Sequence, residues 1–263
     1  MAVRSQRRRR LRGPSLLFLL LVAVTAAGGV LATFDSGGLR TAGILLLVLG
    51  GWAVSLCLHE FGHAYVAYRS GDWSVRDKGY LTLDIRRYTD PVLSFVLPLI
   101  FLLIGGIPLP GGAVWINHAA IRSRAAESAV SFAGPGANLG IGVLLVLAVA
   151  LIEPSYGSVF GPTNGLVAGL SCLAFVQILA FLLNILPVPG LDGFGMIEPY
   201  LSYNARRIAN QVRPWAPLAL FAVLIAVPAI SGPFFDLGRE LFELLGGNTY
   251  AAAEGFAAFP TWR

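Results

Sequence analysis

Residues 41–70 read TAGILLLVLGGWAVSLCLHEFGHAYVAYRS, an apolar run that ends in a cluster of ionisable side chains. Residues 41–58 carry no charge, and about 20 such apolar residues are enough for a helix to cross a bilayer. Tyr68 and Arg69 mark the far interface, where aromatic and basic side chains gather. The pattern predicts a membrane-spanning helix from about Thr41 to Tyr68, with the HEFGH sequence inside the membrane.

The HEFGH sequence has the spacing of a zinc-peptidase motif. His59 and His63 are four residues apart, so they share one face of a helix and both imidazoles can bind one tetrahedral zinc. Glu60 can then reach the zinc-bound water and act as general base. At 1.5 Å per residue the motif lies roughly 10 Å below the interface at Tyr68. Ionisable groups at that depth are expensive and indicate function, so a structural role without metal is the weaker interpretation.

A third zinc ligand is needed, and the sequence NILPVPGLDG at 184–193 supplies a candidate. Asp192 follows the apolar run 164–186 after two prolines and a glycine. Proline lacks an N–H and glycine permits unusual φ, so the segment should end the helix and turn the carboxylate back toward the histidines. Asn184 could donate a hydrogen bond to the substrate or to the oxyanion. Its alternative role is hydrogen bonding between helices.

The composition indicates that the whole chain is a membrane protein. Of its 263 residues, 56% are hydrophobic and 13% charged, whereas a soluble domain carries roughly a quarter charged residues. We expect an α-helical polytopic protein, organised as one domain over residues 1–263 with its core at 41–200. Five apolar runs are long enough, or nearly so, to span the bilayer, namely 14–34, 41–58, 129–152, 164–186 and 214–235.

The formal charge of +5 fits the positive-inside rule better than nucleic-acid binding. A basic run at 7–12 precedes the first apolar run and predicts a cytoplasmic N-terminus. We favour an uncleaved first helix, although removal of residues 1–26 as a signal peptide is an alternative. If the short run 91–107 is re-entrant, 16 of the 19 Lys and Arg residues are cytoplasmic and the histidines share a membrane depth with Asp192. The expected location is therefore the cell membrane, multi-pass, with the active site toward the cytoplasm.

Two segments alternate between apolar and polar residues in the manner of strands. The first is Tyr80–Ile85, and the second is Ala113–Asn117, which follows Pro110, Gly111 and Gly112. We expect them to form a small β element near the active site. The segment 113–117 could add as a strand to an unwound substrate.

These motifs together resemble the site-2 protease family of intramembrane zinc peptidases, whose motifs are HExxH and NxxPxPxLDG. The sequence FAGPGAN at 132–138 is similar to the AGPxxN segment of that family's central helix, and 79–117 is similar to its compact branch without PDZ or CBS domains. The resemblance covers about 41–200. It implies that His59, His63 and Asp192 bind one Zn²⁺ per chain and that Glu60 is the base. It also implies residues that contact the substrate or transition state, namely Asn184, Gly134, Pro135 and Asn138.

By this resemblance the chain cleaves peptide bonds in or near transmembrane segments of membrane-protein substrates, which is regulated intramembrane proteolysis. Its expected partners are such substrates and the lipid bilayer, with no nucleic acid. A gating partner, a homo-oligomer and the identity of the substrate have no signal in the sequence. Two alternatives stay open. One is another membrane-embedded HExxH peptidase, whose third ligand is a glutamate, and the other is a transporter or an inactive homologue that holds substrates.

Two departures from the family pattern stand near the motifs. Phe194 follows the LDG sequence where many members have a second glycine. His118 stands where the compact branch often has proline, and we do not expect it to be a metal ligand.

Overall fold

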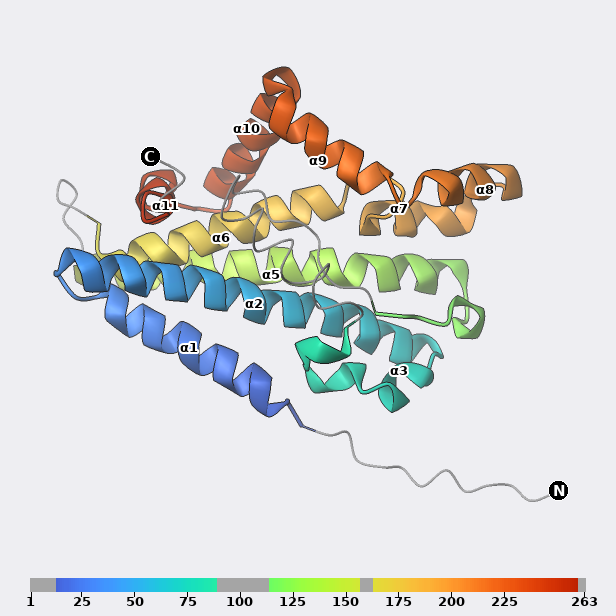
Figure 1. Ribbon diagram of the computed structural model, residues 1–263, viewed down its shortest axis with the longest axis horizontal. Coiled ribbons are helices and arrows are strands. Elements are labelled where there is room, and N and C mark those ends of the chain that lie inside the picture. The colour runs from blue at the N-terminus through green and yellow to red at the C-terminus, as the bar shows by residue number, and fades with distance from the viewer. Residues whose placement is uncertain (1–12, 89–113, 157–162, 260–263) are drawn as a thin grey trace.

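The computed structural model describes residues 13–88, 114–156 and 163–259 (Figure 1). Within these ranges the chain forms helices and turns. The helices are α1 (Leu16–Ala32), α2 (Gly37–Ser70), α3 (Ser74–Asp77), α5 (Arg124–Tyr156), α6 (Gly165–Asn184), α7 (Asp192–Ile197), α8 (Tyr203–Val212), α9 (Ala216–Ala226), α10 (Pro228–Leu244) and α11 (Thr249–Phe256). Short 3-10 turns lie at η1 (Tyr80–Thr82), η2 (Ile85–Arg87), η4 (His118–Ala120) and η5 (Glu198–Tyr200).

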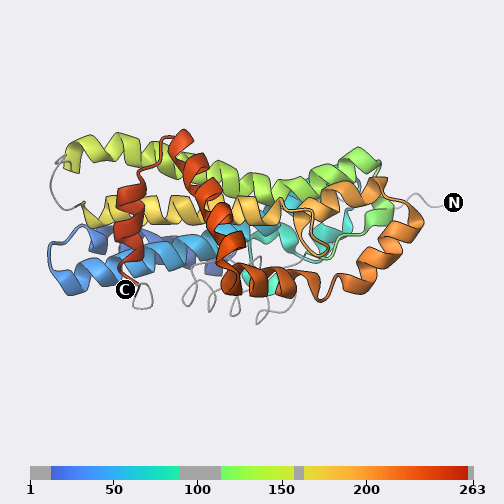
Figure 2. The same ribbon diagram turned by 90° about the horizontal axis from the view of Figure 1, so that it is seen from above.

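The long helices α2, α5 and α6 lie side by side, and each contacts the other two. In Figures 1 and 2, α2 and α6 run in one direction and α5 runs in the opposite one. The C-terminal parts of α2 and α6 and the N-terminal part of α5 therefore lie in the same half of the bundle, where α6 ends short of the other two (Figures 1 and 2). Residues that are far apart in the sequence gather there.

Glycines allow α1 to pack closely along α2. A Cβ atom on Gly28 would lie 2.5 Å from the backbone nitrogen of Leu47, and one on Gly43 would lie 2.2 Å from that of Ala32. Small residues at such crossings are typical of helices that associate within membranes.

Among the described residues, three helices are long and apolar enough to cross a membrane, namely Gly37–Ser70, Arg124–Ile152 and Gly165–Asn184. The bent pair α8 and α9 adds a fourth if it is one span. The expectation of about five spans is not supported. The run 14–34 becomes α1, which has only 17 residues. The run 214–235 is divided between α9 and α10 at Pro228, because proline removes a backbone donor and interrupts the helix. The predicted re-entrant run 91–107 lies outside the described residues.

The predicted β element is wrong for the part that the structure describes. Tyr80–Ile85 contains the 3-10 turn η1 and, after two residues, the first residue of η2, and Val114–Asn117 is not a strand. The backbone of the second segment is held by a side chain, since the Asp72 carboxylate accepts a hydrogen bond from the Asn117 backbone N–H at 2.7 Å. The apolar residues of the first segment lie in tight turns and pack against a small core cluster that contains Tyr80.

Candidate metal centre

Three potential ligands meet just beyond the end of α6, beside the C-terminal half of α2. The Nε2 atoms of His59 and His63 are 3.1 Å apart, and the Asp192 carboxylate oxygens lie 3.2 Å from the first and 3.4 Å from the second. A tetrahedral zinc with bonds of about 2.0–2.2 Å separates its ligand atoms by about 3.3–3.6 Å. Among the described residues, this group of ligand atoms therefore has the dimensions of a zinc site.

The outer nitrogens of both imidazoles are engaged by acceptors. His63 Nδ1 lies 2.7 Å from the backbone carbonyl of Val130, and His59 Nδ1 lies 2.5 Å from Asn138 Oδ1. A carbonyl oxygen only accepts, so His63 Nδ1 must donate, and in the neutral ring Nε2 then carries a lone pair. Metal-binding histidines usually have such a partner behind them. The donor set thus fits a metal better than it fits two facing Nε2 atoms that can share only one proton.

Glycines create the room in front of the imidazoles. A Cβ atom on Gly134 of α5 would lie 2.2 Å from His63 Nε2 and 2.5 Å from His59 Nε2. A Cβ atom on Gly62 of α2 would lie 2.8 Å from the Ala133 carbonyl oxygen. These two glycines bring α2 and α5 close together and leave the space beside the ligand atoms open.

The loop between α6 and α7 places Asp192. Helix α6 ends at Asn184, and Asp192 begins α7. Gly190 has φ +100°, which favours glycine, and a Cβ atom on Gly193 would lie 2.1 Å from the Ile185 carbonyl oxygen. The backbone therefore folds tightly onto the end of α6 and returns the carboxylate to the histidines, as the proline and glycine pattern predicts.

The Asp192 carboxyl faces both imidazoles. Burial favours its neutral form, but when no metal is bound the imidazoles can take up a second proton, and their positive charge and hydrogen bonds hold the pKa of the carboxyl well below its usual range. The ionised carboxylate is the form that binds metals.

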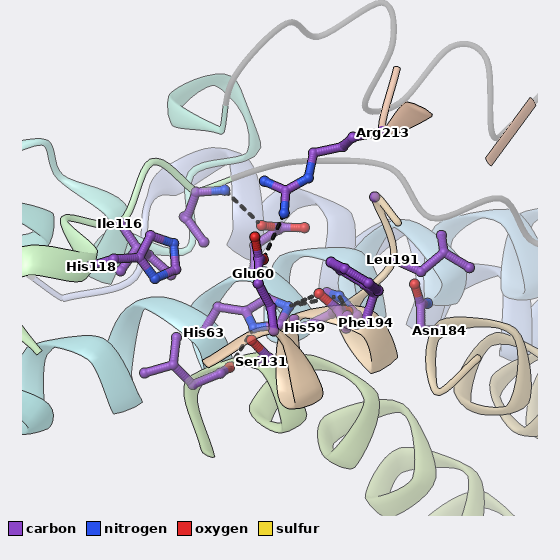
Figure 3. Close-up of a pocket in the computed structure, with 16 residues that line it drawn as sticks. His59, Glu60, His63, Ile116, His118, Ser131, Asn184, Leu191, Phe194 and Arg213 are labelled. Carbon is purple, nitrogen blue, oxygen red and sulfur yellow. Dashed lines mark hydrogen bonds and ion pairs between the residues drawn. The ribbon is translucent and has the colours of Figure 1, made fainter. Parts of the chain in front are cut away.

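Glu60 faces a cavity of about 280 Å³ that opens beside the ligand group (Figure 3). Its side chain is buried, and its Oε2 accepts a hydrogen bond from the Val114 backbone N–H at 3.2 Å. An ion pair of Arg213 and Glu198, 2.6 Å between Nη2 and Oε2, also lines this cavity. The cavity is lined by His59, Glu60, His63, Val114, Ile116, His118, Val130, Ser131, Asn184, Gly190, Leu191, Asp192, Phe194, Gly195, Glu198 and Arg213.

The predicted substrate residues divide into two groups. Asn184 lines the cavity, and its amide donates one hydrogen bond to the Ala180 carbonyl at 3.0 Å. Among the described residues its second amide proton has no acceptor and can serve a ligand. Gly134, Pro135 and Asn138 are buried on α5 and do not belong to the cavity lining. Gly134 lies beside both imidazoles and Asn138 contacts His59, so these two residues support the imidazoles from α5.

Other residues at the site were not predicted from the sequence. Gln177 is a fully buried amide in the middle of α6, and its polarity within an apolar run was a signal that could have found it. The role of the Val130 carbonyl could not be predicted from the sequence, because every residue has a backbone carbonyl. His118 is exposed, lines the cavity and lies outside the group of ligand atoms found among the described residues.

Three relatives share most of the length of this chain. The protein named "Putative zinc metalloprotease Rip2" of Mycolicibacterium smegmatis is 43% identical over 246 residues, 92% of this chain and 92% of that protein. The protein of the same name from Mycobacterium tuberculosis is 42% identical over 253 residues, 95% and 94% of the two chains. "Putative zinc metalloprotease YwhC" of Bacillus subtilis is 30% identical over 196 residues, 71% and 84%. No protein-family model and no solved structure matches the chain.

Proposed function

The chain belongs to the site-2 protease family of zinc metalloproteases, and we propose that it hydrolyses peptide bonds in or near transmembrane segments of other membrane proteins. The names of the relatives support a metallopeptidase with Zn²⁺ as its cofactor. His59, His63 and Asp192 are the zinc ligands in this proposal, Glu60 is the catalytic base, and Asn184 contacts the substrate.

One observation carries the proposal. Three ligand atoms of a zinc site lie together within 4.8 Å of one another, and a glutamate from the same helical turn lines the same cavity. Glu60 neighbours His59 in the sequence, and Figure 3 shows its side chain beside the two imidazoles. Metallopeptidases need this combination, because the base must act on a water next to the metal.

The protein groups have separate tasks in the reaction. When bound, zinc supplies a Lewis acid that activates water and polarises the scissile carbonyl. Glu60 takes a proton from the attacking water and returns it to the amide nitrogen as the C–N bond breaks. The free amide proton of Asn184 can stabilise the oxygen that gains negative charge.

The third ligand favours this family over the other HExxH peptidases of membranes. Those enzymes use a glutamate on a later helix, whereas the group found among the described residues is completed by Asp192. A transporter or an inactive homologue would not need a base. The presence of Glu60 beside the ligands therefore supports an enzyme.

The decisive experiment compares Glu60→Gln with the unmodified protein. Purified full-length protein in detergent is assayed for bound zinc and for cleavage of a panel of single-span membrane proteins. Glu60→Gln should keep about one zinc per chain and lose cleavage, because it removes a base and no ligand. Glu240→Gln, an exposed glutamate on α10, is the matched control and should retain both. Cleavage by Glu60→Gln at the wild-type rate would refute the proposed role of Glu60.

The proposed location is the cell membrane, multi-pass, with the N-terminus and the active-site end toward the cytoplasm. The excess of basic residues in the loops at that end supports this orientation. Single cysteines test it in a background without Cys57 and Cys172. Labelling of D77C, R124C and N204C from the cytoplasm and of D35C from outside is expected, since all four positions are exposed. The reverse pattern would contradict the orientation.

A further inference from the structure

A continuous series of hydrogen bonds crosses the three long helices and ends at His59. The Ser55 hydroxyl of α2 bonds to the Trp52 carbonyl at 2.8 Å, and Gln177 Nε2 of α6 bonds to Ser55 Oγ at 2.9 Å. Asn138 Nδ2 of α5 bonds to Gln177 Oε1 at 2.8 Å, and Asn138 Oδ1 contacts His59 Nδ1 at 2.5 Å. Ser55, Gln177 and Asn138 are all buried.

The direction of this series is fixed at its first member. The Trp52 carbonyl can only accept, so the single proton of the Ser55 hydroxyl points to it. The hydroxyl oxygen must then accept from Gln177, which turns the NH₂ group of Gln177 to Ser55 and its oxygen to Asn138.

The same logic orients the last two members. Because Gln177 presents an oxygen, Asn138 must present its NH₂ group to Gln177 and its oxygen to His59. An oxygen beside Nδ1 requires that Nδ1 carry the proton. His59 Nε2 then has a lone pair directed at His63 and Asp192.

An asparagine alone does not guarantee this outcome. Its amide has nearly the same shape when turned by 180°, and the turned amide would present an NH₂ group to His59. Nδ1 would then accept, and the proton would move to Nε2, where it blocks a metal. Something must therefore choose between the two orientations of Asn138.

We propose that Gln177 and Ser55 are positioning residues that select the amide orientation of Asn138 and thereby hold His59 in its zinc-binding tautomer. The inference rests on the proposed ligand role of His59 and extends it to two residues that do not line the cavity. The rival explanation is that these polar groups only join the helices, as buried amides and hydroxyls do in many membrane proteins.

The first test is the affinity for zinc, measured on the purified full-length protein by competition with a chelator. Gln177→Leu keeps most of the volume and removes both hydrogen bonds, so Asn138 loses the partner that orients it. Affinity should fall by about ten- to 100-fold, the usual effect of removing a group behind a metal ligand. Ser171→Ala is the matched control, because Ser171 is equally buried on α6 and its Oγ has no partner in the part of the chain that is described. It should bind zinc like the wild type.

The second test is a rescue that helix packing alone does not predict. A carboxylate accepts at both oxygens, so Asn138→Asp presents an acceptor to His59 in either orientation. The double variant Gln177→Leu with Asn138→Asp should therefore recover zinc affinity relative to Gln177→Leu. If the residues only join helices, the added buried carboxylate should weaken binding further.

Substitution of Ser55 is an independent test of the direction of the hydrogen-bond series. Ser55→Ala should weaken zinc binding less than Gln177→Leu does, and it should have no further effect when Gln177 is already leucine, because both act through the same amide. Additive losses would overturn the inference, as would wild-type affinity in Gln177→Leu or a failed rescue in protein that retains its helical content.

The zinc affinity of His59→Ala separates the ligand role of His59 from the positioning role of Gln177 and Ser55. Retention of zinc there would refute the ligand assignment, whereas loss there with no effect of Gln177→Leu would refute only the positioning role.

Discussion

The two sides of the metal centre are built differently. On one side, His59 and His63 project from the interior of a 34-residue helix, and each outer nitrogen has a buried partner on α5. On the other side, Asp192 begins a six-residue helix after a loop, and its side chain is 24% exposed. The histidines are placed by helical spacing and packing between helices, while the aspartate is placed by the backbone of a loop. Disturbance of the two sides should therefore have unequal consequences.

The largest effect is expected on the histidine side, from Gly134→Ala. The new methyl group would lie within 2.5 Å of both Nε2 atoms and displace two ligands at once. Structural zinc sites gain about 10–16 kcal/mol from roughly four ligands, so losing two should lower zinc affinity more than about 1,000-fold. Zinc content and cleavage should both vanish. Gly140→Ala on the same helix meets no atom within 4 Å and should leave both unchanged. Stoichiometric zinc in Gly134→Ala would show that α2 and α5 can move apart to accept the methyl group without displacing the imidazoles.

A smaller effect is expected when the loop ligand itself is removed. Asp192→Ala deletes one ligand and leaves the two histidines with their partners intact. By the same division per ligand, zinc affinity should fall on the order of 100-fold, measured by chelator competition. If Asp192→Ala held zinc as tightly as the wild type, another residue would have to be the third ligand. A loss of zinc affinity larger than that of Gly134→Ala would mean that the aspartate side matters more for zinc binding than the histidine side.

A still smaller effect is expected when the loop is displaced but Asp192 is kept. A methyl group in Gly193→Ala would meet the Ile185 carbonyl at 2.1 Å, and such overpacking typically costs about 1–3 kcal/mol. Zinc affinity should decrease by about tenfold and the melting temperature should fall. Gly232→Ala, which meets nothing within 4 Å, is the control for adding a methyl group outside the site. Unchanged zinc affinity would mean that the loop adapts to the methyl group without moving Asp192.

The smallest effect is expected at the cavity wall. The ion pair of Arg213 and Glu198 is partly exposed, and pairs of this kind contribute about 0–1 kcal/mol. Arg213→Gln should leave zinc affinity unchanged and alter kcat/KM by at most about fivefold. A loss of 100-fold or more would give Arg213 a direct part in the reaction, and loss of zinc would place it in the support of the ligands.

Motif spacing predicted the helical side of this site well. The four-residue interval between His59 and His63 depends only on helix geometry, and that geometry survives folding. The return of Asp192 was also predictable, because prolines and glycines constrain the backbone locally. The composition indicated a helical membrane protein for the same reason: bilayer length and polarity set simple requirements.

Tertiary contacts explain what the sequence did not predict. Alternation in Tyr80–Ile85 resembles a strand, yet a strand needs a neighbour, and these residues turn around a core cluster instead. Asn138 was assigned to the substrate because its motif resembles a family segment, but its contact is His59. Which way an amide points depends on partners from α2 and α6 that no local pattern specifies.

The position of Glu60 limits what can reach it. Its side chain is buried and lines the same cavity as the three ligand residues, whereas the amides of an intact helix are held in hydrogen bonds within that helix. Under the proposed function, a scissile segment therefore has to lose its helical shape before its carbonyl can lie beside Glu60. The proposed enzyme would then select its substrates by the ease with which a short stretch uncoils, a property set by residues such as glycine and proline. Selectivity of this kind depends on how easily the substrate backbone unwinds, and it requires no pocket that matches a particular side chain.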